Sequence, residues 1–280
     1  MLSRPTPKKM ILGLLLAWGG KPLSVRDAIR ACALFDLTEN NTRVTLVRLS
    51  SEGLIQGVER GQYVLGPRAE GMAADVGRWR EAPGRLRPWN GDWMMVLTGT
   101  RDQRGRQAKQ QQLRALDLCG LRPLDAGLYL RPANLAGDVP LLRERLDALG
   151  APCGTLVAHL SDLDGARDKA ARALWDGEAL QKAYKQTTER LNTWLGRYHS
   201  LDLEEAARES YLLGNDAIRQ LVYDPWLPEG LVDVESRQRL FEAVCAVDDA
   251  GKSVWAQLFD QEAAMPIGTA NFASRESFAS

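Results

Sequence analysis

The chain has 280 residues, of which 45% are hydrophobic and 26% are charged, and its formal net charge is zero. This length and apolar content predict about two domains with buried cores, or three small ones, and no segment approaches the ~20 consecutive apolar residues of a membrane span. The 4 cysteines include no C-x-x-C pair and there are only 2 histidines, so neither a disulfide framework nor a zinc site is indicated. We expect a globular, cytoplasmic protein with no cofactor and no bound metal.

Two helices are predicted at the start of the chain, separated by Gly19-Gly20, with Ser24 capping the second. The inward positions are Met10, Ile11, Leu14, Leu15 and Trp18 in the first helix and Val25, Ala28, Ile29 and Cys32 in the second. A competing interpretation is a signal peptide, because Lys8 and Lys9 precede the apolar run MILGLLLAW. We favour the helix, since the run is short and the site after Trp18 is a poor small-x-small cleavage sequence.

The next segment, Leu37 to Tyr63, reads as a capped helix followed by a short hairpin. Thr38 or Asn40 is the expected N-cap and Gly53 the expected end of the helix. At about 100° per residue, one helical face is suited to a core; it holds Thr42, Thr45, Leu46 and Leu49. The opposite face mixes amide and guanidinium donors with apolar groups, the residue types that read base edges in a major groove. The predicted DNA contacts on this face are Asn40, Asn41, Arg43, Val44, Val47 and Arg48.

Two strand-like runs follow the helix, Leu54 to Glu59 and Gln62 to Leu65, and the chain turns at Arg60-Gly61. We expect Arg60 and Gln62 at this tip to lie along a phosphate backbone or in a minor groove. With the three preceding helices, the hairpin predicts a winged helix-turn-helix that binds DNA. The alternative is an ordinary surface helix, on which Arg48 forms a structural ion pair.

The charge distribution agrees with a DNA-binding amino-terminal module. Residues 1–88 carry 14 Lys and Arg against 8 Asp and Glu, a net charge of +6, whereas residues 151–280 have a net charge of −8. A basic module on an acidic remainder is typical of a nucleic-acid reader attached to a regulatory or dimerising body. A net charge of this size is also common in proteins that do not bind DNA, so the main evidence for DNA binding remains the helix and hairpin.

Beyond a predicted linker from Arg78 to Pro88, strands and helices alternate. Strands are expected at 93–98, 124–130 and 154–160, and helices at 106–118 and 139–149, which predicts a small ferredoxin-like sheet with helices on one face. From Ala166 the pattern is helical, with one late helix through Val247, another over 254–259, and a mobile tail over 261–280. The predicted fold class is α+β, with domains at 1–80, 81–165 and 166–260.

Five segments in order, RVTLVRLSSEGLI, PWNGDWMMVLTG, GLRPLDAGLYLRP, ARALWDGEALQKAY and YDPWLPEGL, resemble the PaaX family over nearly the whole chain. Members of this family are bacterial repressors of phenylacetate catabolism and their relatives. The resemblance implies an amino-terminal winged helix-turn-helix, a ferredoxin-like (Cas2-like) middle domain, a helical carboxy-terminal domain and a homodimer on double-stranded operator DNA. It also implies release by an acyl-CoA effector such as phenylacetyl-CoA, and a regulator rather than an enzyme.

An effector pocket is predicted in the acidic half, where aromatic side chains would surround an acyl group and basic side chains would meet coenzyme A phosphates. The candidates are Arg167, Arg172, Trp175, Tyr184 and Trp226. The alternative for each aromatic residue is ordinary core packing, and for each arginine a solvated helix surface.

Two other functions are weighed against the regulator. A metal-dependent nuclease needs a carboxylate where the first strand of the middle domain ends, but the first acid after that strand is Asp102, in an expected loop. A protein-interaction scaffold with a weak DNA-binding head is compatible with the sequence, and binding to DNA at physiological salt distinguishes it from a regulator.

Overall fold

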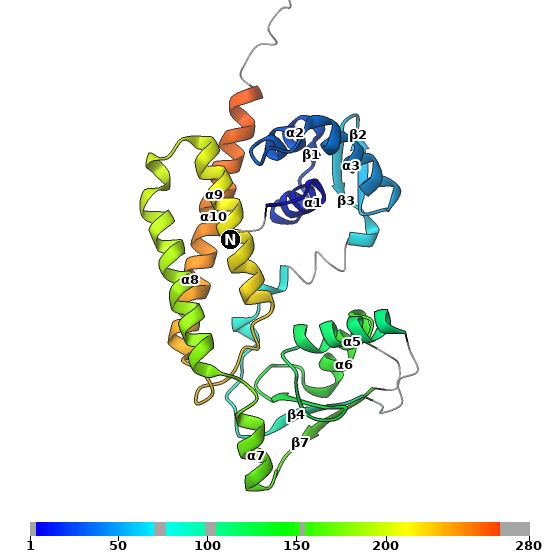
Figure 1. The fold of residues 1–280 in the computed structure, drawn as a ribbon, viewed down its shortest axis with the longest axis vertical. Helices are drawn as coiled ribbons and strands as arrows, with labels where there is room; N and C mark the ends of the chain where they lie inside the picture. The colour runs from blue at the N-terminus through cyan, green and yellow to red at the C-terminus, as the bar shows by residue number, and fades with distance from the viewer. Residues whose placement is uncertain (1–3, 70–76, 99–104, 152–154, 264–280) are drawn as a thin grey trace, which may run out of the picture.

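The computed structural model describes residues 4–69, 77–98, 105–151 and 155–263. Over these residues the chain has an α+β fold, with two small antiparallel sheets and long carboxy-terminal helices (Figure 1). Among the helices described, none combines the length and apolarity that a bilayer crossing requires. Asp102 and the part of the predicted tail from residue 264 onward lie outside the described residues.

Three helices and a three-stranded sheet form the amino-terminal part. The helices are α1 (Pro7–Ala17), α2 (Val25–Ala33) and α3 (Glu39–Ser51), and the strands are β1 (Leu23–Ser24), β2 (Ile55–Glu59) and β3 (Gln62–Leu65). The predicted helices and hairpin are present, and Ser24 caps α2 as expected by accepting the backbone N–H of Asp27. The structure adds β1, which pairs antiparallel with β3; a strand of two residues is too short to produce a periodic signal.

The apolar run that also resembles a signal peptide is part of the protein core. Met10, Ile11 and Leu15 on α1 are fully buried against α2, α3 and the far ends of two carboxy-terminal helices. Thr6 caps α1, and Pro7 stands at its first position, where a missing backbone N–H costs nothing. The run is apolar because three sides of this helix are covered by other elements.

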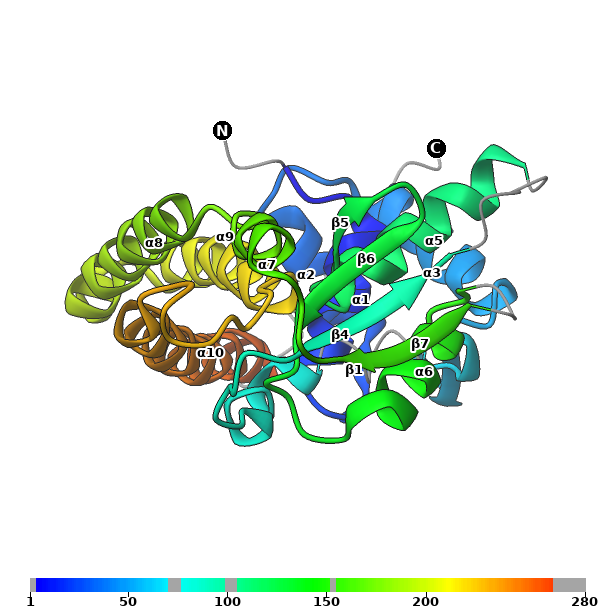
Figure 2. The same cartoon turned by 90° about the horizontal axis from the view of Figure 1, so that it is seen from below.

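The middle part has a four-stranded antiparallel sheet in the order β5-β6-β4-β7. Its elements are β4 (Trp93–Leu97), α5 (Arg106–Leu118), β5 (Arg122–Asp125), β6 (Leu128–Pro132), α6 (Asp138–Ala148) and β7 (Leu156–Leu160). Helices α5 and α6 cover one face of the sheet (Figures 1 and 2). Alternate residues of β4 point to that face and pack there, including Met94 and Val96.

The prediction of a single strand over 124–130 was wrong, because the chain turns in the middle of that run. Residues Ala126 and Gly127 connect β5 to β6, and Gly127 has a φ of +76°, which glycine adopts without strain. The element order is therefore β-α-β-β-α-β. Helix α5 connects β4 to β5, which lie on either side of β6, and α6 connects β6 to β7, which lie on either side of β4. A β-α-β-α-β order has one strand fewer and cannot form this sheet.

The prediction of a linker from Arg78 to Pro88 was also wrong. Two short 3-10 turns, η2 (Arg78–Arg80) and η3 (Pro83–Arg85), occupy this segment. Trp79 is buried in the core of the carboxy-terminal helices, and the Arg80 guanidinium forms ion pairs with Asp248 and Asp249. The Pro and Gly content that suggested a linker instead shapes a segment that packs between the sheet and the helices.

Four helices form the carboxy-terminal part: α7 (Gly165–Arg172), α8 (Gly177–Arg197), α9 (Leu203–Val222) and α10 (Val234–Ala263). The two late helices predicted through Val247 and over 254–259 are one continuous helix, and α10 also includes residues 261–263 of the predicted tail. Gly251 lies between the two predicted helices and has a packing role, because a Cβ at this position would lie 3.3 Å from the Cβ of Ser210 on α9. Lys252 pairs with Asp248 one turn earlier across the same region.

Helices α9 and α10 extend through two cores. At one end, Ala206 and Ala207 of α9 and Trp255 and Leu258 of α10 pack against α1, α2 and α3. Toward the other end, residues including Leu221 and Val244 pack with the long helix α8 and with the sheet. The pair therefore connects the amino-terminal helices mechanically to the middle of the molecule (Figure 1).

Asp233, just before α10, stabilises the start of that helix. Its carboxylate accepts the Ser236 hydroxyl at 2.6 Å, the Gln181 amide at 2.6 Å and the backbone N–H groups of Glu235 and Ser236. These bonds, with the Ser236 hydroxyl first, lower the pKa of Asp233 from 3.8 to about 2. A depressed folded-state pKa contributes stability above the ordinary value, and this contribution is lost as pH falls from 3.8 toward about 2.

We expect Asp233→Ala to lower the free energy of unfolding at neutral pH and to lose most of that effect near the folded pKa of about 2. Urea titrations of both proteins at the two pH values measure the difference. The carboxylate of Asp147, which is exposed on α6, provides the control variant Asp147→Ala. An Asp233→Ala effect of equal size at both pH values would contradict the ionised cap.

Candidate nucleic-acid interface

Helix α3 separates its core face from its solvent face as the sequence predicted. Thr38 is the cap and accepts the Asn41 backbone N–H at 3.3 Å, which decides between the two expected cap residues. Thr42, Leu46 and Leu49 are buried against α1 and α2. Thr45, also predicted on the core face, is only half-buried, and its hydroxyl donates to the Asn41 carbonyl at 2.7 Å. Every predicted contact residue on the opposite face is exposed; these are Asn40, Asn41, Arg43, Val44, Val47 and Arg48.

The exposed face of α3 is unusual for its apolar content. Val44 is 59% exposed and Val47 is 67% exposed, whereas Leu46 and Leu49 on the other face of α3 are buried. In Figures 1 and 2 this helix lies on the side of the amino-terminal bundle that is turned away from α8, α9 and α10. The face is thus accessible to a large partner.

The two arginines of this face are held only by weak surface ion pairs. Arg43 donates to Glu39 at 2.7 Å and Arg48 lies 3.6 Å from Glu52. Glu52 is also the acceptor of Lys8, whose hydrogen bond is the largest cause of the lowered Glu52 pKa. Exposed pairs of this kind contribute about 0–1 kcal/mol, so both guanidinium groups can exchange these carboxylates for a partner.

The hairpin beside α3 is fixed to the bundle at its base and tip. Strand β3 pairs with both β1 and β2, and the Val25 backbone N–H donates to the Gly61 carbonyl at 2.9 Å. Gly61 has a φ of +74°, so glycine is favoured at this turn. Arg60 at the tip is exposed and has no ion-pair partner among the described residues, whereas Gln62 is half-buried.

Sequence reasoning missed Val58, which is 49% exposed on β2. It lies close to the tip, next to a register irregularity between Gly57 and Glu59. All residues of β2 after Ile55 are exposed, so the alternation of apolar and polar residues that identifies a strand face is absent here. The signal available in the sequence was Val58 itself, an apolar residue in an otherwise polar run.

Helix α3 and the hairpin together present two kinds of contact. A single exposed helix with amide, guanidinium and methyl groups has the width and chemistry to enter a major groove. The hairpin tip, with one unpaired arginine, can lie on the phosphate backbone beside it. The arrangement thus offers base contacts on the helix and positioning contacts on the hairpin.

The predicted effector residues fall into separate surroundings. Trp175 is buried and stacks on Trp93, with ring centroids 6.1 Å apart and planes 5° apart. Arg172 forms an ion pair with Asp168 at 2.6 Å and lies over the Trp89 ring, 4.7 Å from its centroid. The W-x-G-x-W segment, Trp89 to Trp93, thus packs against α7.

The remaining three candidates differ in exposure. Arg167 is exposed and paired with Asp164. Tyr184 is buried and donates its hydroxyl to Asp224, and burial of the ring raises the pKa of Tyr184 above its ordinary value. Trp226 is buried with a left-handed φ of +51°, which is rare for a bulky residue. Of the five candidates, the structure links Tyr184 and Trp226, because Asp224 accepts the Trp226 backbone N–H at 2.7 Å.

Comparison with known proteins relates this chain to a family model and to a solved structure. Residues 175–257 match the family model of the PaaX-like protein C-terminal domain. The uncharacterized protein Rv0674 from Mycobacterium tuberculosis has a similar fold, with a TM-score of 0.62 at 19% sequence identity over 91% of this chain and 98% of that one. No curated protein matches the sequence.

Proposed function

We propose that this chain, a PaaX-like protein, is a transcriptional regulator that binds DNA sequence-specifically through α3. The observation that carries the proposal is the solvent face of this helix, where two largely exposed valines lie among exposed amide and guanidinium side chains. Apolar groups are suited to the thymine methyl, amides to adenine, and guanidinium groups to guanine. A solvated helix in a protein without a DNA partner gains nothing from the two valines.

In this proposal residues 1–80 form a winged helix-turn-helix head, residues 81–165 a ferredoxin-like (Cas2-like) domain, and residues 166–260 an effector and dimerisation domain. The topology described above supports the first two assignments. Two heads of a homodimer would enter successive major grooves of a palindromic operator, with half-sites about 34–36 Å apart or a multiple of that spacing. Binding there represses a promoter for aromatic-acid catabolism.

An acyl-CoA effector such as phenylacetyl-CoA is proposed to release the DNA. The route that supports this is the pair α9 and α10, which pack on the head at one end and on the body at the other. A small rotation of this pair would change the distance between the two heads. Loss of the half-site spacing exchanges specific binding for a non-specific mode that is about 10³- to 10⁷-fold weaker.

The first test is a titration of the purified protein with the duplex upstream of its own gene and with a scrambled duplex, at about 150 mM salt. Specific binding that phenylacetyl-CoA abolishes is the expected result. Specific binding that phenylacetyl-CoA does not change would support the regulator and contradict phenylacetyl-CoA as its effector. Equal affinity for the two duplexes would show that the upstream region is not the operator, and it would favour the alternative of a protein-interaction scaffold.

The hairpin tip should contribute affinity without sequence preference. We expect Arg60→Ala to weaken binding to specific and scrambled duplexes by a similar factor, and to reduce the slope of log K against log salt by about 1. The reason is that an exposed arginine without an internal partner neutralises a phosphate.

Arg190→Ala is the matched control for the hairpin variant, since Arg190 is an exposed arginine of α8, 3.9 Å from Asp216. It should leave both the affinity and the salt slope unchanged. A change in sequence preference by Arg60→Ala with no change in slope would show that the hairpin reads bases instead.

A further inference from the structure

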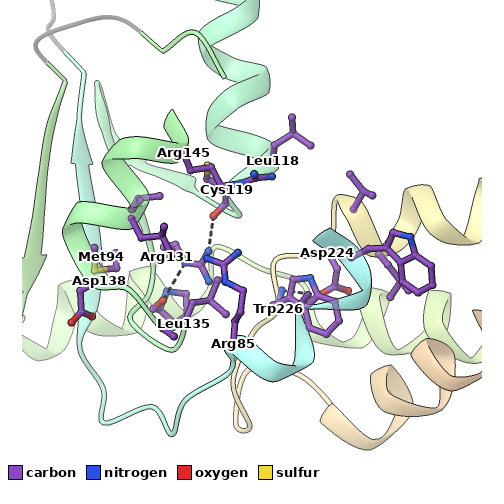
Figure 3. A pocket seen from close by; sticks show the side chains of 18 residues that line it. Arg85, Met94, Leu118, Cys119, Arg131, Leu135, Asp138, Arg145, Asp224 and Trp226 are labelled. Atoms are coloured by element: carbon purple, nitrogen blue, oxygen red, sulfur yellow. Dashed lines mark hydrogen bonds between the residues drawn. The ribbon is translucent and has the colours of Figure 1, made fainter. Parts of the chain in front are cut away.

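A cavity of about 100 Å³ lies between the middle part and the carboxy-terminal helices (Figure 3). Its walls come from the sheet and α6, from the η2 and η3 turns, from the end of α9 and from the loop that follows it. Most of the wall is apolar, and its apolar lining includes Trp79, Leu135, Leu141, Leu221 and Trp226. The cavity is therefore formed only when the two parts of the chain pack together.

Arg131 of β6 lies in this cavity as a buried cation with no ion-pair partner among the described residues. It is 6% exposed, and its guanidinium donates to the carbonyls of Cys119 at 2.8 Å and Pro132 at 3.3 Å and to the side-chain oxygen of Asn134 at 3.4 Å. All three acceptors are neutral. A guanidinium has five N–H donors, so part of its hydrogen-bonding capacity is unused within the described structure.

A second guanidinium lies beside the first. Figure 3 shows the Arg85 side chain, from η3, directed toward Arg131, and no ion pair of Arg85 is present among the described residues. Burial lowers the pKa of Arg131 to about 10; the Cys119 thiol opposes this shift, and the charge of Arg85 adds to it. That value still leaves Arg131 protonated at neutral pH, so two positive charges face each other across an apolar cavity.

The other charged groups on the wall do not balance this pair. Arg145 adds a third guanidinium, and Asp138 is exposed at the opposite rim (Figure 3). Asp224 is already occupied, since it accepts the Tyr184 hydroxyl and the Trp226 backbone N–H. Burial raises the pKa of the Asp224 carboxyl above its ordinary value. A buried unpaired charge is strongly unfavourable, and an anion between the two arginines would compensate it.

We infer that this cavity binds a small organic carboxylate, with the carboxylate between Arg131 and Arg85 and the apolar tail against Trp79 and Trp226. The planar guanidinium fork matches a carboxylate in a bidentate geometry. The apolar walls favour a ligand with a hydrocarbon tail over phosphate, whose surface is entirely polar. Since benzene occupies an apolar cavity of about 150 Å³, this one accommodates about four or five non-hydrogen atoms, the size of acetate or propionate.

The site goes beyond DNA binding and can be tested on the protein alone. Asn134 connects it to the loop after α9, because the Asn134 amide accepts from Arg131 through its oxygen and donates to the Trp226 carbonyl at 2.7 Å. A bound carboxylate would thus hold the sheet against the helices through Arg131. It would also support the left-handed backbone of Trp226, which is already held at both its N–H and its carbonyl.

The experiment measures thermal unfolding of the full chain with sodium propionate, and with propionamide, sodium phosphate and sodium chloride at matched ionic strength. We expect propionate to raise the midpoint by about 5–10 °C at about 100 times its dissociation constant, and the other three to have little effect. A shift with phosphate but not propionate, or equal shifts with propionate and propionamide, would overturn the proposal.

Calorimetric titration of variants with propionate separates the site from general stabilisation. Arg131→Lys retains a charge that can still approach the Cys119 carbonyl, and Arg85→Gln changes a half-buried residue with no described partner. Each should weaken propionate binding by about 10- to 100-fold. Arg167→Gln, on the exposed surface of α7, is the control and should bind normally. Unchanged affinity in folded Arg85→Gln and Arg131→Lys proteins would contradict the assignment.

Discussion

Replacing both arginines of the exposed α3 face, in Arg43→Ala/Arg48→Ala, should lower affinity for the specific duplex by about 30- to 2 × 10⁴-fold. This follows if each arginine makes one base contact that contributes about 1–3 kcal/mol. Affinity for a scrambled duplex should fall much less, because that mode depends mainly on phosphate contacts. Binding titrations with both duplexes at one salt concentration give the two changes separately.

The fold should be intact in this double variant. Both side chains are exposed, at 57% and 78%, and their partners Glu39 and Glu52 remain solvated after the change. We therefore expect the midpoint of thermal unfolding to change little, since surface substitutions of this kind stay within about 0.5 kcal/mol. Arg190→Ala again serves as the control. An unchanged specific affinity in the double variant would remove α3 as the base-reading element.

Trp93→Ala should destabilise the protein by about 3–5 kcal/mol, the range for removal of a large buried aromatic side chain. Trp93 is 1% exposed on β4 and joins the sheet to the carboxy-terminal part. Its ring stacks on that of Trp175 and packs edge-on against that of Trp89, with 5.2 Å between the Trp89 and Trp93 ring centroids. Its indole N–H donates to the Asp168 carboxylate at 3.1 Å. Denaturant unfolding followed by tryptophan fluorescence and by circular dichroism measures the loss.

Two variants test whether the effect comes from this aromatic contact. Trp93→Phe retains a ring but loses the N–H donor, and it should cost less than Trp93→Ala. Leu97→Ala changes another residue of β4, which is 40% exposed, and should have a small effect. If Trp93→Ala were no more harmful than Leu97→Ala, the W-x-G-x-W segment would not hold the two parts together.

Local patterns in the sequence were sufficient for the candidate DNA-binding surface. The 3.6-residue period of α3 separated the buried Thr42 and Leu46 from the exposed arginines and valines, and the glycines at 53 and 61 marked the helix end and the hairpin turn. These features are decided within one helical turn or one tight turn. A single sequence contains all the information that they need.

Predictions failed where distant contacts overrode a local signal. Two helices were predicted, one through Val247 and one over 254–259, but α10 is continuous, and Gly251 within it allows α9 to approach at Ser210. The Pro and Gly of 78–88 looked like a linker, but Trp79 finds a buried position in the helical core. Neither partner is near in sequence, so periodicity and composition could not have indicated either result.

The sequence by itself determined the α+β class, the helix with its hairpin, and the residues that the α3 face exposes, because hydrophobic periods and turn residues act over a few positions. Only the tertiary structure decided where the charges are buried. Arg131 is one of 36 basic residues, and nothing adjacent to it distinguishes it from a solvated arginine. Its environment is produced by Asn134, Arg85 and the loop at Trp226, which come together only when sheet and helices pack. The cost of burying a charge depends on that packing, which is a property of the folded chain as a whole.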